Sequence, residues 1–432
     1  MTSSRTTRSG AASSRRWSRP SREGPVHRPG SYHALLTFSV LALLCVGVVM
    51  VYSSSAMFAE KENDTEFFLK KQMFFALLGV AAMVAAKNVD YRRLRVLAYP
   101  LLALAFVALV AVLIPKLGAH INGARRWIRL GPVQFQPAEY VKLALIVYLA
   151  YSLARKQEKI KSFTVGFLPH VMLVGMLCLL LLRQPDFGTS VVLFFILFAM
   201  LFVAGAKISY LLGAIMVAAP FAYHVIMRSE YRAKRMLAFL NPWEHRRTIG
   251  YQVTESLMTI GSGGMWGMGL GEGKQKLFFL PAAHTDFIFA IIGEEFGFAG
   301  IIGVALLFVL FVYSGIQIAM RAGDLFGMFL AFGVTAAIAA QAVVNMMVVT
   351  GLLPTKGFTL PFVSYGGSSL VITMAGVGLL QSVHAVRGTP PPVAADDELP
   401  APVAAPAGAS ARVLRPLRRL RSLMPRGRNR RR

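Results

Sequence analysis

Charged residues are scarce in this chain: they make up 15% of its 432 residues, whereas soluble proteins carry about 25%. Hydrophobic residues account for 55%, and long apolar runs recur along the sequence. Runs of about 20 apolar residues are long enough to cross a bilayer as helices. The composition therefore excludes a soluble enzyme and predicts an all-α, polytopic integral membrane protein.

Cysteine is nearly absent as well. The two cysteines, Cys45 and Cys178, lie inside apolar runs, with no spacing that suggests a disulfide or a metal site. The glycine-rich stretch GSGGMWGMGLGEGK at 261–274 does not fit a nucleotide-binding loop. Such a loop has a glycine where this chain has Met268, and a hydroxyl residue after its lysine, where this chain has Gln275. No cofactor or metal site is predicted from these residues.

Acidic residues are few: the sequence contains 20 Asp and Glu residues and 46 Lys and Arg residues, which gives a net charge of +26. Residues 1–33 carry +6 and residues 387–432 carry +8, so more than half of the excess lies in two tails. Basic segments beside apolar runs are typical of the cytoplasmic side of a membrane rather than of nucleic-acid binding. We predict a basic N-terminal tail (1–33), a membrane domain (34–387) and a cytoplasmic C-terminal tail (388–432). The last is Pro/Ala-rich and then Arg-rich, and it either lies on anionic lipid or is solvated.

Ten membrane spans are predicted, and an even number agrees with two cytoplasmic termini. The expected spans are 35–55, 70–89, 96–115, 138–153, 164–182, 189–206, 208–227, 286–318, 325–349 and 366–386.

Two of the predicted outer loops are unexpectedly cationic. The first, 116–137, contains Arg125, Arg126 and Arg129 and no acid, and the large outer loop 228–285 adds further Arg and Lys residues. These cations are either solvated or bound to lipid headgroups, or they hold an anionic substrate. We favour the substrate, because guanidinium groups pair bidentately with phosphate oxygens.

Two motifs place ionisable residues at the ends of spans. In QPAEYVK, Glu139 and Lys142 are three residues apart and share a helical face, so they form either a local ion pair or part of a functional site. In RQPDFGT, Asp186 is either the cap of the next helix or a residue that lines a site.

The last two motifs lie near the final spans. Lys356 precedes SYGGSS and is expected to join the outer cations. In HTDFIFAIIGEEFG, Asp286 follows His284 and directly precedes an apolar run. This carboxylate is a helix cap, a structural partner or a general base. The glutamates further along, at 294 and 295, are expected to be buried structural partners.

At these residues the sequence resembles the SEDS family (shape, elongation, division and sporulation), and in particular its division branch. The resemblance covers about 34–387. It rests on six motifs in this order: INGARRWIRLGP, QPAEYVKLALI, RQPDFGTS, NPWEHRRTIGYQVTES, AHTDFIFAIIGEEFG and LPFVSYGGSS.

The resemblance implies a ten-helix protein of the bacterial cytoplasmic membrane that polymerises lipid II into septal peptidoglycan strands at the outer face. Its implied partners are a class B penicillin-binding protein (the septal transpeptidase FtsI), other division membrane proteins and membrane lipids. Asp286 corresponds to the essential acid of the family, and Glu139 and Lys142 to its residues on the fourth span. No nucleic acid is implied.

In this reading, Asp286 deprotonates the acceptor hydroxyl, and cations stabilise the diphosphate that leaves. The expected substrate-binding residues are Arg125, Arg126, Trp127, Arg129, Glu139, Lys142, Asp186, His284 and Lys356. Trp127 either stacks on a sugar or anchors at the interface, and a divalent cation (Mg²⁺ or Mn²⁺) on the diphosphate is compatible with the scheme. A lipid II flippase and a non-catalytic division scaffold remain alternatives.

Overall fold

The computed structural model describes residues 31–60, 66–115, 117–121, 124–130, 133–274, 280 and 283–385. The two predicted tails lie almost entirely outside these residues. Within them, ten helices are long and apolar enough to cross a membrane, as predicted. They are α1 (Ser31–Glu60), α2 (Phe67–Asn88), α3 (Leu94–Leu113), α4 (Pro137–Arg155), α5 (Leu168–Arg183), α6 (Phe187–Ala204), α7 (Ile208–Met227), α10 (Ile288–Met320), α11 (Leu325–Val349) and α12 (Gly367–Ala385).

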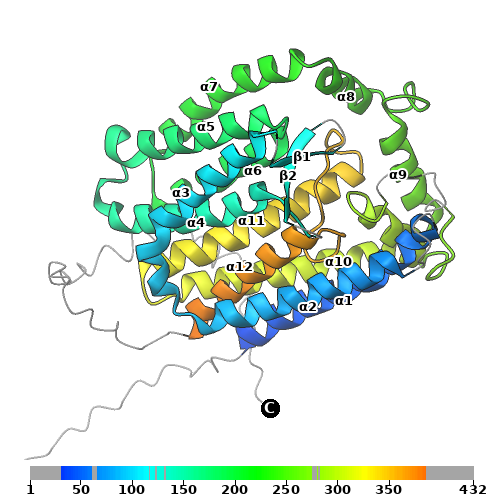
Figure 1. Cartoon of the computed structure of the whole chain (residues 1–432), viewed down its shortest axis with the longest axis horizontal. Coiled ribbons are helices and arrows are strands. Elements are labelled where there is room, and N and C mark those ends of the chain that lie inside the picture. The colour runs from blue at the N-terminus through cyan, green and yellow to red at the C-terminus, as the bar shows by residue number, and fades with distance from the viewer. Residues whose placement is uncertain are drawn as a thin grey trace, which may run out of the picture.

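The spanning helices lie roughly side by side in one bundle (Figure 1). The start of α1 and the end of α12 lie at the same end of it, where the rings of His33 and His384 are 5.8 Å apart. This agrees with the prediction that both termini are on one side of the membrane. The opposite end carries the shorter elements and is the predicted outer end.

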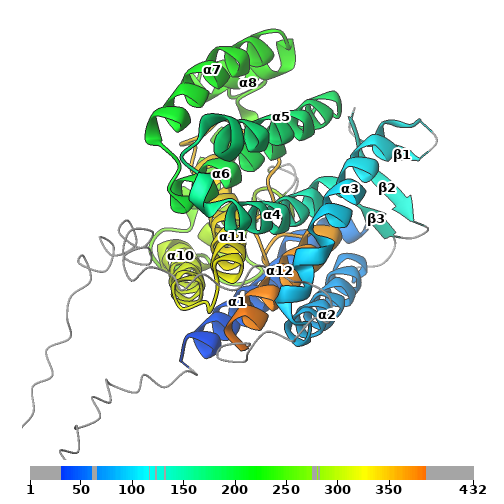
Figure 2. The same ribbon diagram turned by 90° about the vertical axis from the view of Figure 1, so that its left-hand side faces the viewer.

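Helices α11, α4 and α6 form the buried centre of the bundle. Ala, Gly and Ser residues let these helices approach closely, as Gly333 does where α11 meets Ile146 and Met200. Several starts are specified locally: Pro137 occupies the first turn of α4, and Asp324 caps α11 by accepting from the Gly327 amide at 3.0 Å. Helix α7 is the exception, since few of its residues are buried, and it stands over α5 and α6 (Figure 2).

The outer end contains elements that the sequence did not predict. Two short helices, α8 (Glu230–Leu240) and α9 (Tyr251–Ser262), occupy the loop before α10. A three-stranded antiparallel sheet precedes α4, in the order β1 (Gly118–Ile121), β2 (Ala124–Leu130) and β3 (Val133–Phe135). Away from the outer end, short one-turn helices lie in the connection between α2 and α3 (Tyr91–Arg93) and in the connection between α4 and α5 (Gln157–Lys159 and Phe163–Phe167).

Helix α10 is broken at Gly297, whose φ of 65° is one that glycine adopts readily. The glycine-rich loop after α9 fills this break. The amides of Met268 and Gly269 donate to the carbonyls of Glu294 and Glu295, at 2.9 and 3.1 Å. The loop's glycines permit this close backbone packing, since a Cβ at Gly267 would collide with the backbone of α10.

The two glutamates at this break are buried, as expected. Glu295 accepts from the Ser53 hydroxyl at 2.6 Å, and Glu294 accepts from the Lys274 amide at 2.8 Å. They tie α1 and the loop to α10, which is a structural role.

Candidate functional site

Asp286 lies in the turn that leads into α10, at the predicted outer end of the bundle. The residue at the N-cap position is Phe287, and no side chain caps the helix. The helix-cap alternative for Asp286 is therefore wrong. Its backbone carbonyl accepts from Asn345 Nδ2 at 2.9 Å, and Gly357 approaches so closely that a Cβ there would lie 3.0 Å from the carboxylate.

The surroundings of Asp286 suit a proton acceptor. Burial raises the pKa of this carboxyl from 3.8 to about 6, while Arg235 and Arg126 act in the opposite direction. A carboxylate of this kind is ionised at neutral pH and is more basic than an exposed one. Both properties are required of a general base that works near pH 7.

Lys356, the residue before Gly357, supplies a buried ammonium group to the same place. Its Nζ has no hydrogen-bond partner among the described residues and lies 4.7 Å from the centre of the Phe187 ring. Burial lowers the pKa of Lys356 from 10.5 to about 7, although Asp186 raises it. Because an ammonium without hydrogen bonds is costly to bury, this one is poised to accept an anionic partner.

Three arginines surround this pair. Arg126 donates to the carbonyls of Gln184 and Pro185 at the α5–α6 turn. Arg235 of α8 donates to the Thr355 carbonyl at 2.9 Å. Along with Arg232, both lower the pKa of Lys356, so their charges converge on it. Each guanidinium has five N–H donors and retains some for an anion. Sequence reasoning noticed the arginines of the outer loop but did not assign Arg235 to the site.

Four of the predicted substrate-binding residues lie on strand β2: Arg125, Arg126, Trp127 and Arg129. The pairing of β1 with β2 passes over Arg126, since Arg125 lies opposite His120 and Trp127 lies opposite Ala119. Only Arg126 acts on Asp286 and Lys356. Arg129 is exposed, and Arg125 and Trp127 are half-buried. The substrate-binding roles of Arg125, Trp127 and Arg129 stay predictions.

The predicted cap role of Asp186 is confirmed, and its role in lining a substrate site stays a prediction. It caps α6 by accepting from the amide and the hydroxyl of Thr189, at 3.2 and 2.6 Å. It is also the acid that raises the pKa of Lys356. It therefore fixes the start of α6 beside the site.

His284 belongs to an aromatic cluster, with its ring 5.1 Å from Phe68 and 5.8 Å from Tyr365. Burial lowers its pKa to about 4, so it is neutral at pH 7. This environment favours a packing role over anion binding.

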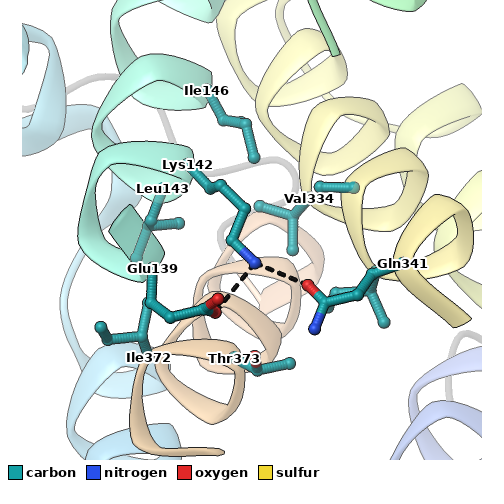
Figure 3. Close-up of a pocket in the computed structure, with 11 residues that line it drawn as sticks. Glu139, Lys142, Leu143, Ile146, Val334, Gln341, Ile372 and Thr373 are labelled. Carbon is teal, nitrogen blue, oxygen red and sulfur yellow. Dashed lines mark hydrogen bonds and ion pairs between the residues drawn. The ribbon is translucent and has the colours of Figure 1, made fainter. Parts of the chain in front are cut away.

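Glu139 and Lys142 form the expected ion pair, with Nζ and Oε2 2.8 Å apart. Lys142 also donates to Gln341 Oε1 at 2.6 Å (Figure 3). Ser369 of the SYGGSS motif donates to Glu139 at 2.9 Å. The group joins α4, α11 and α12 beside a cavity of about 40 Å³, which is room for about one water molecule.

Gln341 and Asn345 on α11 are the polar residues that sequence reasoning missed. Both are buried, and both hold the loop that carries Lys356. The available signal was a Gln and an Asn four residues apart in an otherwise apolar run, because such residues share a helical face.

A large apolar groove of about 1270 Å³ runs between α5, α6 and α7. Phe187 lines it and also lies against the Lys356 ammonium. The groove therefore leads to the cationic site. Among the described residues, no group of three or more His, Cys, Asp or Glu side chains is placed to hold a metal ion.

Comparisons with known proteins agree with this architecture. Residues 34–388 match the family model described as cell cycle protein and named for FtsW, RodA and SpoVE. The probable peptidoglycan glycosyltransferase FtsW of Geobacter metallireducens is 48% identical over 83% of this chain and 96% of its own length. The stage V sporulation protein E of Bacillus subtilis is 45% identical over 81% of this chain and 96% of its own length.

Solved structures are similar too. One chain, from a structure described as coordinating polymerization and crosslinking by a peptidoglycan synthase complex, is 32% identical. It has a TM-score of 0.70 and covers 82% of this chain and 98% of its own. The rod shape determining protein RodA of Thermus thermophilus is 31% identical, with a TM-score of 0.62 over 82% of this chain and 97% of its own. The resemblance drawn from the six motifs is thus confirmed, and the chain belongs to the SEDS family of cell cycle proteins that includes FtsW, RodA and SpoVE.

Proposed function

We propose that this chain is a peptidoglycan glycosyltransferase that polymerises lipid II at the outer face of the cytoplasmic membrane during septal wall synthesis. One observation carries the mechanism. Arg126 and Arg235 act on both a basic, half-buried carboxylate, Asp286, and a buried cation, Lys356, and Asp286 adjoins Gly357, the residue after Lys356. Phe187, which lines the apolar groove, lies against the Lys356 ammonium. A polyprenyl-diphosphate sugar has three parts that match these: a reacting sugar, an anionic leaving group and a long apolar tail.

The reaction is a single displacement. Asp286 accepts the proton of the acceptor sugar hydroxyl, whose oxygen attacks the anomeric carbon of the donor. As the new C–O bond forms, the bond to the diphosphate breaks, and the configuration inverts. Lys356, Arg126 and Arg235 stabilise the charge that develops on the diphosphate. Because the diphosphate leaves as an anion, no general acid is required.

A divalent cation is compatible with this scheme but carries no step of it. Asp286 and Asp186 are the carboxylates that act electrostatically at the site, and the described residues form no larger ligand group around them. Mg²⁺ or Mn²⁺ would therefore be held mainly by diphosphate oxygens and would neutralise their charge.

The proposed partners follow from the relatives. A class B penicillin-binding protein would crosslink the strands, as in the similar synthase complex, which coordinates polymerization and crosslinking. We place the site at the outer face because of charge: the chain ends that lead into the two basic tails lie at the other end of the bundle.

The groove should set the affinity for the polyprenyl tail. Gly213 lines it, and a Cβ at this position meets nothing within 4 Å. We expect Gly213→Leu to raise the KM for lipid II about tenfold with kcat nearly unchanged, because about 1.4 kcal/mol of lost tail burial corresponds to that factor. Initial rates over a range of lipid II concentrations measure this.

Gly303→Leu is the matched control, since Gly303 on α10 is equally open but lies outside the groove. An unchanged KM in Gly213→Leu would place the tail elsewhere.

The direct test is polymerisation of labelled lipid II by the purified chain in liposomes, with and without its cognate class B penicillin-binding protein. The proposal expects glycan strands on a gel. A flippase would instead move labelled lipid II between leaflets without forming strands, and a scaffold would do neither.

A further inference from the structure

Resting on the proposed function, we infer that Gln341 and Asn345 are positioning residues. They hold the turn of Asp286 and the loop of Lys356 on one face of α11. The Glu139–Lys142 pair then serves the reaction through Gln341, not by contact with the substrate as the sequence suggested.

Asn345 joins the two parts of the site. Its Nδ2 donates both of its protons to backbone carbonyls, one of Asp286 at 2.9 Å and one of Phe358. The side chain is almost fully buried, so these bonds are shielded from water. The main-chain position of Asp286 is therefore fixed relative to the loop that contains Lys356 and Gly357.

Gln341 anchors the same loop one residue further along. Its Nε2 donates to the carbonyl and the hydroxyl of Thr359, at 3.0 and 3.3 Å. Phe358 and Thr359 are consecutive in the loop. Asn345 and Gln341, on successive turns of α11, therefore donate hydrogen bonds to two successive carbonyls of the loop. Gln341 and Asn345 are four residues apart and so lie about 6 Å apart along one helical face.

The ion pair on α4 sets the orientation of this clamp. Lys142 donates to Gln341 Oε1 at 2.6 Å, which directs the amide nitrogen of Gln341 toward the loop (Figure 3). Glu139 accepts a hydrogen bond from the Ser369 hydroxyl at 2.9 Å. Its carboxylate lies 2.8 Å from the Lys142 ammonium and so fixes the position of that ammonium. A chain of hydrogen bonds thus runs from α12 and α4 through α11 to the Lys356 loop.

The test compares three variants of the full chain, assayed with lipid II and the partner transpeptidase. Asn345→Ala removes both donors, and Asn345→Asp keeps the shape but replaces the amide by a carboxyl. Gln341→Glu keeps the acceptor for Lys142 and removes the donor to Thr359. Ser256→Ala is the matched control. It deletes a buried hydrogen bond of 2.7 Å from the Ser256 hydroxyl of α9 to the Val349 carbonyl, which belongs to α11 like Gln341 and Asn345.

We expect Asn345→Ala to lower kcat about 100-fold and Gln341→Glu about tenfold, with KM changed less than twofold. Misplacing a catalytic group by about 1 Å costs about this much in rate. The Ser256→Ala variant should keep the wild-type kcat even if its melting temperature falls equally. A purely structural role would lower the melting temperature of the α11 variants without this selective loss of kcat.

The Asn345→Asp variant adds a pH signature. When protonated, the introduced carboxyl still donates one hydrogen bond to a carbonyl, and when ionised it repels both. Its activity relative to wild type should therefore fall as pH rises, whereas that of Asn345→Ala should stay constant. The titratable groups nearby, Asp286, Lys356 and Lys142, are retained in both variants.

The outcomes separate two failures. If Asp286→Asn is inactive but Asn345→Ala and Gln341→Glu keep the wild-type kcat, the positioning role alone is overturned. If Asp286→Asn is fully active, the proposed mechanism fails, and the positioning role fails with it.

Discussion

Replacing Asp286 by asparagine is expected to lower the rate of lipid II polymerisation by about 10²–10⁴-fold, the usual contribution of a general base. The substitution preserves the size of the side chain and the backbone contact with Asn345. It removes the only function that the mechanism requires of this residue, which is to accept a proton. Because burial raises the pKa of the carboxyl, its removal should not destabilise the fold.

The loss should therefore appear in kcat, with an unchanged amount of folded protein and an unchanged complex with the transpeptidase. Glu244→Gln serves as the charge-matched control, because Glu244 is exposed in the same outer segment. Wild-type kcat in Asp286→Asn would assign the carboxylate a structural role and contradict the mechanism.

Replacing Lys356 by methionine is expected to reduce kcat/KM for lipid II about 10²–10³-fold, as when one donor to a developing anion is removed. The same substitution should raise the melting temperature, since it deletes a buried ammonium whose Nζ has no hydrogen-bond partner among the described residues. A lower kcat/KM together with a higher melting temperature would show that Lys356 serves catalysis rather than the stability of the fold.

The pH dependence gives this prediction its sign. The pKa of Lys356 is about 7 in the folded chain, below its ordinary 10.5, so the unfolded chain binds the proton more tightly. The penalty to stability is complete below pH 7 and disappears as pH rises toward 10.5. The gain in melting temperature for Lys356→Met should therefore be largest below pH 7.

Activity should follow a narrow bell as pH is varied. Asp286 must be ionised, which sets the acid limb at about 6, and Lys356 must be protonated, which sets the alkaline limb at about 7. Lys356→Arg keeps the charge at all accessible pH values, so it should remove the alkaline limb. A bell that is unchanged in Lys356→Arg would assign that limb to another group.

A steric variant tests the position of Lys356 without altering its charge. A Cβ at Gly188, in the first turn of α6, would collide with the Lys356 side chain, so Gly188→Ala should reproduce part of the activity loss. Gly303→Ala is its control, because a Cβ there meets no atom within 4 Å and Gly303 lies outside the apolar groove. In an unobstructed helix this change is stabilising by about 0.5–1 kcal/mol.

The membrane spans were predictable because long apolar runs have few alternatives. The last-but-two span illustrates the precision, since 286–318 was expected and Ile288–Met320 is observed. The break at Gly297 was not visible, because its cause is a loop that arrives from elsewhere. The sheet and the helices α8 and α9 were missed because they are short and mix polar with apolar residues, so they lack the long apolar runs that marked the spans.

The chemistry of the site was predictable in part. Asp286 and Lys356 stand out because ionisable residues beside apolar runs are rare. What they contact depends on packing between α6, α8 and α11, which no single segment encodes. The irregular pairing of β2 at Arg126 depends on its register with β1, and the hydrogen bond from Lys142 to Gln341 joins segments that are distant in the sequence.

The break in α10 constrains how this chain can be assembled. A helix interrupted within a bilayer leaves backbone groups that lipid cannot satisfy. Here the preceding loop provides for them: the carbonyls of Gly264 and Met265 accept from Phe298 and Ala299, at 2.9 and 3.2 Å. Because this loop is synthesised before α10, its partner is already present when the helix emerges from the ribosome. The two segments form a short-range unit that can close during translation, before any distant helix is needed.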